Sequence, residues 1–230
     1  MRALTNQLIE SLPSKDRKRL LAICEPVELV LSEVLFDSDT PTRHVYFPTG
    51  GFVSLVTPLE GKPVLEVGIV GREGMLGSQV ALGVTTIPLH ALVQGPGPAW
   101  RITTAAFKYE LGRSVAMQRN LNRYIHVSML QLAAMAGCVR FHQIGPRLAR
   151  WLLMMHDRSP TDTFHVTHEF LAYMLGVRRV GITGAAVSFQ RRGLIDYRRG
   201  ELTVLDRAAL EASACSCYAT DQKSYAEFLN

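Results

Sequence analysis

The stretch that decides the fold spans residues 166–205 and has the sequence VTHEFLAYMLGVRRVGITGAAVSFQRRGLIDYRRGELTVL. Thr167 can cap a helix over residues 168–175, because its hydroxyl can accept a hydrogen bond from the free amide groups at a helix start. Gly176 follows directly, and glycine tolerates the positive φ that a tight turn requires. A second helix then ends at Gly193. The pattern predicts two helices joined by a short turn.

The small and apolar residues of this stretch have the spacing of a helix-turn-helix. Ala172 lets the helices approach closely, Gly176 forms the turn, and Ile182 anchors the second helix. Two short β runs at 194–197 and 201–205 flank an Arg-Arg-Gly sequence, which is typical of a hairpin. We therefore expect a winged helix-turn-helix, and an ordinary helical hairpin is the alternative.

Arginine is concentrated in the same stretch. The chain has 230 residues and a formal net charge of +5. Residues 178–200 contain six arginines and one acid, Asp196, so this segment alone has a net charge of +5. Arginine makes bidentate and phosphate contacts more readily than lysine does. The pattern indicates double-stranded DNA as a partner, and a solvated basic face is the alternative.

The N-terminal half has a different texture. After two short helices within residues 4–23, β-rich runs occur at residues 27–31, 44–47, 52–57, 64–70 and 89–93. Clusters of Gly, Pro, Asp and Thr separate these runs, which is typical of antiparallel strands joined by turns. No helical crossover alternates with the strands, so a parallel nucleotide-binding sheet is excluded. We expect a sandwich-like or barrel-like β domain.

A long helical segment connects the two halves. Thr103 and Thr104 can cap a short helix over residues 105–111, and no proline interrupts residues 114–145. The heptad-spaced positions in the long segment are Leu121, Ile125, Ser128, Leu132, Met135 and Val139. This 4-3-4-3-4 spacing favours a helix that pairs with a second copy. The alternative is a helix that packs on its own β domain.

Four segments of the chain resemble the Crp/Fnr family of bacterial transcription regulators. They are residues 147–153 (RLARWLL), 166–183, 194–200 and 214–218 (ACSCY). The resemblance implies an α+β fold with an N-terminal antiparallel, jelly-roll-like β-roll of the cyclic-nucleotide-binding type. Its parts would be a sensor domain with N-terminal helices over residues 1–112, a dimerisation helix over 113–145, and a winged helix-turn-helix domain over 146–230.

The resemblance also implies a function. It predicts a homodimeric, sequence-specific DNA-binding regulator that recognises a palindromic operator, responds to a small-molecule effector and can contact RNA polymerase. Ligand-dependent repositioning of the two recognition helices would control DNA binding. The alternative is a small-molecule sensor whose C-terminal domain acts mainly through protein contacts.

The recognition helix implied by the resemblance covers residues 178–190. Arg179 is the expected contact to guanine, and Arg178, Thr183 and Ser188 are expected to add to it. Val180 and Gly184 replace two further base-contacting residues of the cyclic-AMP-responsive member, so its target sequence is not transferred. Phosphate contacts are expected from Thr167, His168, Arg191, Arg192, Arg198 and Arg199.

The cofactors of the family are not expected here. Ser78 stands where the ribose-binding glutamate should be, and residues 85–90 contain no arginine for a cyclic phosphate. Cyclic AMP is therefore not the expected effector. Only Cys24 lies in the first 130 residues, which excludes the N-terminal iron–sulfur ligand cluster of the oxygen-sensing branch. Cys215 and Cys217 are two ligands at most, and side chains two positions apart on a helix do not face one another, so we expect no metal site.

Other classes of protein are not favoured by the sequence. The chain lacks a Gly-x-Ser-x-Gly elbow, a phosphate-binding loop and a His-Glu-x-x-His zinc motif, so we do not expect an enzyme. No apolar stretch approaches the ~18 residues of a membrane span, and the first residues lack the apolar core of a signal peptide. Four scattered cysteines do not form a disulfide framework. We expect a cytoplasmic protein with reduced thiols and no membrane partner.

Overall fold

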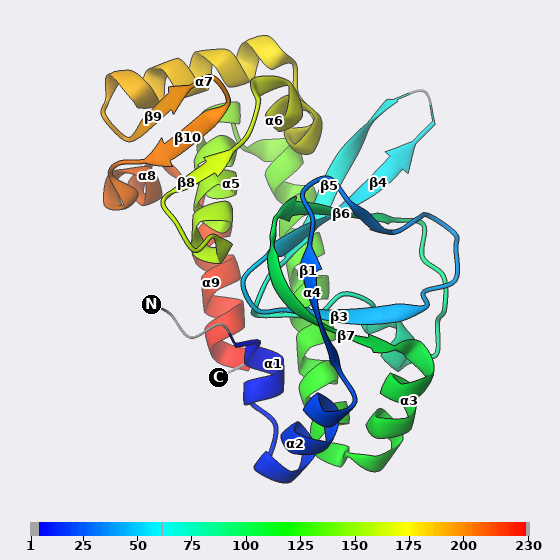
Figure 1. The fold of residues 1–230 in the computed structure, drawn as a ribbon. Coiled ribbons are helices and arrows are strands. Elements are labelled where there is room, and N and C mark those ends of the chain that lie inside the picture. The colour runs from blue at the N-terminus through cyan, green and yellow to red at the C-terminus, as the bar shows by residue number, and fades with distance from the viewer. Residues whose placement is uncertain (1–4, 61, 229–230) are drawn as a thin grey trace.

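The computed structural model describes residues 5–60 and 62–228, in which a β-roll is joined by a long helix to a C-terminal helical unit (Figure 1). The roll region contains α1 (Gln7–Glu10), α2 (Ser14–Ala22), β1 (Glu25–Leu29), β2 (Val34–Phe36), β3 (His44–Pro48), β4 (Phe52–Leu59), β5 (Lys62–Val70), the 3₁₀ helix η1 (Ser78–Leu82), β6 (His90–Gly95), β7 (Gly97–Thr103) and α3 (Thr104–Arg113). The remainder contains α4 (Val115–Phe141), α5 (Ile144–Arg158), β8 (Thr163–His165), α6 (His168–Leu175), α7 (Arg179–Arg191), β9 (Ile195–Arg198), β10 (Glu201–Val204), α8 (Arg207–Ser213) and α9 (Cys217–Phe228). The predicted α+β class is confirmed.

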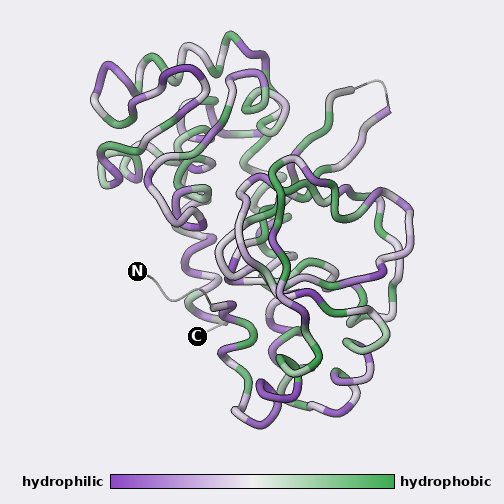
Figure 2. Tube along the Cα trace, in the orientation of Figure 1, coloured by the Kyte–Doolittle hydropathy of each residue, from purple (hydrophilic) through white to green (hydrophobic). Residues whose placement is uncertain are grey.

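The roll consists of two antiparallel sheets. One sheet has the strand order β1-β7-β3, and the other has the order β2-β6-β4-β5. Apolar residues from both sheets fill the space between them, including Leu29, Tyr46, Val53, Val93 and Leu76. Hydrophobic residues follow the roll strands in Figure 2, whereas α2 and the β9–β10 turn are mostly hydrophilic. The roll therefore has a core of its own.

Strands β2 and β7 are not among the predicted β runs. Strand β2 has only three residues, which is too short for a sequence pattern, and it is a strand because it pairs with β6. Strand β7 begins at Gly97, within a segment that has the composition of a turn. The φ of Gly97 is +150°, and an added Cβ would lie 2.9 Å from the Gly50 carbonyl carbon. Glycine thus lets β7 start immediately beside another backbone.

The predicted helix starts agree with the observed caps. Thr103 caps α3 by accepting from the Ala106 amide at 3.3 Å, and Ser114 caps α4 by accepting from Met117 at 3.1 Å. Each cap satisfies an amide that has no partner within its helix. The N-terminal helices are also present, although Leu4, the first residue of that predicted segment, lies outside the described residues.

Helices α8 and α9 were not predicted from the sequence. Helix α8 packs against α5, and α9 extends the C-terminal unit back along α4 (Figure 1). Tyr225 on α9 donates to Gln131 on α4 at 3.2 Å, and Asp221 pairs with Arg150 on α5 at 2.6 Å. Both residues of this ion pair are buried. The last helix therefore connects α4 and α5 instead of continuing the winged domain.

The roll contacts α5 through two buried carboxyl groups. Glu66 on β5 accepts hydrogen bonds from Trp151 Nε1 at 2.8 Å and from Ser54 at 2.5 Å. Glu73, in the turn after β5, pairs with Arg158 at 2.6 Å and also accepts from the Gly71 amide. The sequence places Glu73 in this turn, but its distant partner is known only from the fold. These contacts fix the roll against the C-terminal unit.

No single helix among the described residues is long and apolar enough to span a membrane. Helices α6 and α7 reach the required length and composition only when taken as a pair, and that pair is bent by 113°.

The buried Glu66 carboxyl predicts a pH-dependent stability. Burial raises the pKa of Glu66 to about 7, although the hydrogen bonds from Ser54 and Trp151 oppose this shift. Between about pH 5 and pH 7 the folded protein retains this proton while the unfolded chain has lost it, so stability should fall as the pH rises. Glu66→Gln removes the charge and should abolish up to about 3 kcal/mol of this dependence.

The measurement is denaturant unfolding of wild type and Glu66→Gln at about pH 5 and about pH 8, on either side of the transition. The variant should be the more stable protein at the higher pH and gain little at the lower pH. Subtracting the two curves removes the contribution of the other titrating groups. An equal stability difference at both pH values would contradict the assignment to Glu66.

Candidate nucleic-acid interface

Helices α6 and α7 form the predicted helix-turn-helix. Thr167 caps α6 by accepting from the Phe170 amide at 3.1 Å. Gly176 ends α6 with a φ of +62°, a conformation that L side chains rarely adopt. Ala172 and Ile182 are both buried in the core shared with α5. The predicted roles of all four residues in the motif are confirmed.

Helix α7 has one buried face and one exposed face. Ile182, Ala186 and Phe189 point into the core. Arg178 precedes the helix and Arg179 begins it, and both side chains are exposed. Helical spacing continues the exposed face to Ser188 and Arg191, among others. The exposed face of α7 thus combines cations with small side chains.

His168 lies where α6, α7 and the β9–β10 hairpin meet. Its ring is stacked on Tyr197, with centroids 4.5 Å apart, and its Nδ1 lies 3.1 Å from the Thr183 hydroxyl. Tyr197 in turn donates to the Val166 carbonyl at 2.8 Å. Burial and the nearby Arg179 lower the pKa of His168, which favours the neutral ring near pH 7. The imidazole therefore contacts all three elements. The His168 side chain is only partly exposed, whereas the predicted phosphate contact requires an accessible ring.

The predicted phosphate-contacting arginines lie at two places. Arg191 and Arg192 are at the end of α7, where Arg192 donates to Ser213 of α8 at 2.9 Å. Arg198 and Arg199 are in the β9–β10 hairpin, and Arg199 has a φ of +52° at the turn. Arg198 pairs with Asp196 at 3.2 Å, yet 82% of its side chain remains exposed. One place is therefore the C-terminal end of α7, and the other is the hairpin that follows it.

The six predicted dimer residues on α4 lie along one side of the helix and differ in burial. Leu121 is buried in the roll core, Ser128 donates to the Tyr124 carbonyl of its own helix, and Met135 accepts from Arg150. These three positions therefore make contacts within the chain. Ile125, Leu132 and Val139 lie beside them on the same side, and Leu132 is 49% exposed. The heptad spacing alone does not distinguish the covered positions from the exposed ones, because only packing against the roll and the C-terminal unit covers part of this side.

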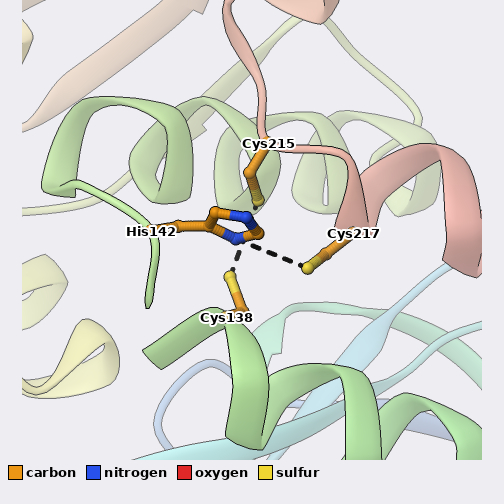
Figure 3. A group of neighbouring side chains, drawn as sticks. All are labelled: Cys138, His142, Cys215 and Cys217. Carbon is orange, nitrogen blue, oxygen red and sulfur yellow. Dashed lines mark hydrogen bonds between the residues drawn. The ribbon is translucent and has the colours of Figure 1, made fainter. Parts of the chain in front are cut away.

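A cluster of cysteine and histidine was missed in the sequence. Cys138 and His142 at the end of α4 lie against Cys215 and Cys217, which precede and begin α9 (Figure 3). The four ligand atoms all lie within 4.8 Å of one another. The Sγ atoms of Cys138 and Cys215 are 3.6 Å apart, as are Cys217 Sγ and His142 Nδ1. This group can hold a metal ion.

The sequence argument against a metal counted only Cys215 and Cys217, and it assumed that both lie on one helix. That premise is wrong, because Cys215 lies in the link between α8 and α9 and only Cys217 is helical. Cys138 and His142 complete the group from a segment more than seventy residues earlier. Their i,i+4 spacing at a helix end was the one available signal.

Comparison with known proteins agrees with this architecture. Residues 146–213 match the family described as the Crp-like helix-turn-helix domain. Among curated proteins, none matches the sequence. Three solved structures with the same fold, each below 25% identity, illustrate the likeness.

FixK2 from Bradyrhizobium japonicum is 14% identical with a TM-score of 0.71, and the match covers 84% of this chain and 98% of that one. A Crp/Fnr-family putative transcriptional regulator from Eubacterium rectale is 17% identical with a TM-score of 0.68, covering 89% and 96%. A CRP-family transcriptional regulator from Thermus thermophilus is 20% identical with a TM-score of 0.67, covering 82% and 96%. The predicted resemblance is confirmed: the chain has the fold of the Crp/Fnr regulators, and its residues 146–213 form a Crp-like helix-turn-helix domain.

Proposed function

We propose that this chain is a homodimeric, sequence-specific DNA-binding transcription regulator whose recognition helix is α7. The observation that carries the proposal is the exposed start of α7. Arg178 and Arg179 lie there side by side, and neither has a carboxylate partner among the residues that the structure describes. Two unpaired guanidinium groups at the start of an exposed helix suit the major groove of DNA.

The first turn of α7 supplies two kinds of base contact. Arg179 offers a guanidinium fork that matches the O6 and N7 acceptors of guanine. Val180 follows it and is 76% exposed, although it is apolar. An exposed valine beside an arginine fits the methyl group of thymine. We therefore add Val180 to the proposed base contacts, together with Arg178, Thr183 and Ser188.

Cations at the end of α7 and in the hairpin that follows it support the proposed phosphate contacts. Arg191 lies at the end of the helix, and Arg198 and Arg199 lie in the hairpin. Phosphate contacts fix the register of a protein on DNA, so these arginines can hold the recognition helix in place. Arg192 contributes charge, but its hydrogen bond to Ser213 also fixes α8.

An exposed apolar stripe on α4 supports the proposed homodimer. It comprises Ile125, Met129, Leu132, Ala136 and Val139, spaced by four, three, four and three residues. Met129 is 62% exposed and Leu132 is 49% exposed. Heptad-spaced apolar residues on a 27-residue helix form the seam of a two-helix interface. Two copies paired along α4 would present two α7 helices to a palindromic site.

The effector we propose is not cyclic AMP. The carboxylate of Glu73 forms an ion pair with Arg158 of α5. Ser78 begins η1, and its side chain has no carboxylate that could bind a ribose. The roll interior between the sheets is apolar. A change in the roll can still reach the DNA-binding unit directly, because Leu65 on β5 lies against the Gly176 turn of the motif. Contact with RNA polymerase and a cytoplasmic location accompany the proposed function.

The alternative function is a sensor whose C-terminal unit contacts protein. Salt dependence separates the two, because DNA binding releases counterions and weakens steeply as salt rises. The concentration of arginine around α7 favours DNA.

Arg179→Ala tests the recognition helix. We expect it to cost about 1–3 kcal/mol on the specific site and to relax preference at one base pair in each half-site. Arg198→Ala is the matched control, because it removes an equally charged and exposed side chain from the hairpin. It should weaken binding to all sequences alike and lower the salt slope by about one unit.

Titration of both variants on selected and scrambled duplexes at two salt concentrations makes the comparison. If Arg179→Ala lowers the affinity for both duplexes by the same factor, Arg179 contacts a phosphate and not a base. If neither duplex binds the wild type in a salt-dependent manner, the proposed function itself is wrong.

Leu132→Glu tests the dimer. A carboxylate in the centre of the apolar stripe would be buried without a partner, so the variant should be monomeric at micromolar concentration and lose operator binding. Leu130→Glu is the control, because Leu130 is also partly exposed but lies about 160° around the helix from Leu132. Analytical ultracentrifugation measures both. If the Leu132→Glu protein is still dimeric, the dimer interface does not lie on this stripe.

A further inference from the structure

The cluster of Cys138, His142, Cys215 and Cys217 lies outside the proposed DNA interface and is not needed for it. Two of its ligands come from the last turn of α4 and two from the start of α9. Cys138 and Cys215 are buried, whereas His142 and Cys217 are partly exposed. The exposed side gives an ion a path to the buried thiols.

The distances within this cluster match a single metal ion. Two thiolates bound to one zinc ion at ~2.3 Å are at most about 4.6 Å apart, and about 3.8 Å apart in a tetrahedron. The Cys138–Cys215 and Cys217–His142 separations are both 3.6 Å, and the widest is within 4.8 Å. An iron–sulfur cluster places several iron and sulfide atoms between its ligands and needs a wider ring. The four atoms are too close together for that.

Buried positive charge lies beside the cluster. Arg147 and Arg150 on α5 are both buried, and the Cys215 amide donates to the carbonyl of Pro146, the neighbour of Arg147, at 3.2 Å. Arg150 is neutralised by Asp221 at 2.6 Å. Arg147 donates to the Leu175 carbonyl but has no carboxylate partner in the described part of the chain. A buried cation without a counter-charge is costly.

We propose that Cys138, His142, Cys215 and Cys217 bind one zinc ion in a tetrahedral Cys₃His site. Binding replaces three thiol protons, which pass to solvent, and the histidine ligates as the neutral ring. Three thiolates and one Zn²⁺ have a net charge of −1. This charge balances the +1 of Arg147, so metal loading explains both the ligand geometry and the unpaired arginine. Soft thiolate and imidazole donors select zinc over magnesium or calcium.

The ion would join two segments that meet where α4 ends and the DNA-binding unit begins. The α8–α9 link would be fixed to the last turn of α4, and α9 already packs along α4 through Tyr225 and Gln131. Zinc would therefore set the angle at which the C-terminal unit leaves the long helix. This role does not depend on the proposed function, because metal content is measured without DNA.

The first experiment measures metal in the full-length protein. Elemental analysis should find about one zinc per chain, and removal by a chelator should lower the melting temperature until zinc is restored. Replacing zinc with Co²⁺ should give the visible absorption of a tetrahedral site and a thiolate-to-cobalt charge-transfer band. Cys217→Ser should lose the stoichiometric ion, whereas Cys24→Ser, which removes the one cysteine outside the cluster, should retain it.

A second pair of variants distinguishes loss of a ligand from loss of folding. His142→Leu removes one donor from a partly exposed position and should abolish the cobalt spectrum. His142→Cys supplies a fourth thiolate and should retain the ion with a stronger charge-transfer band. A side chain with only a packing role would not show this contrast.

Three results would overturn the proposal. The first is a protein without bound metal that also fails to take up Co²⁺. The second is iron together with acid-labile sulfide in place of zinc. The third is a Cys138–Cys215 disulfide, found by peptide mapping, in protein purified without reductant. If zinc binding is confirmed but DNA binding is not, the site stands and the proposed function fails.

Discussion

The position of the C-terminal unit depends on the buried contact between α5 and the roll. Glu66 accepts from Trp151, and Glu73 pairs with Arg158, so two points of α5 are held by carboxyl groups from β5 and the turn that follows it. Removing one partner of such a pair leaves a buried polar or charged group without compensation, which costs several kcal/mol. The roll, the motif and α9 are therefore arranged around one helix whose residues are buried on nearly all sides.

Helix α4 has two tasks, and its two faces are assigned by what covers them. One face lies against the roll and α9, and it contributes Leu121 and Tyr124 to the protomer's core. The exposed stripe around Leu132 lies next to this covered face. At its end, α4 also supplies Cys138 and His142 to the cysteine and histidine cluster. A helix that contacts the roll, α9 and, in the proposed dimer, a second copy can transmit a displacement from any one of them to the others.

The proposed interface combines a fixed support with exposed charge. Ile182, Ala186 and Phe189 fix α7 to the core, and the His168–Tyr197 stack fixes the hairpin beside it. Among the described residues, the arginines of this surface have no carboxylate partner except for the short-range pair of Arg198. In the proposed complex, fixed backbone positions would keep the register on DNA, and the planar guanidinium groups would bind phosphates.

The sequence by itself determined the features that local chemistry controls. The caps at Thr167 and Thr103 and the left-handed Gly176 follow from the conformational preferences of single residues, so the helix-turn-helix and its wing could be predicted. Only the tertiary structure decided which face of α4 is free, because two heptad registers are equally apolar. Strands β2 and β7 exist because neighbouring strands pair with them. Folding also places Cys138 next to Cys215, which lies 77 positions later in the sequence. Such contacts depend on how distant elements pack, and no spacing within a single segment encodes them.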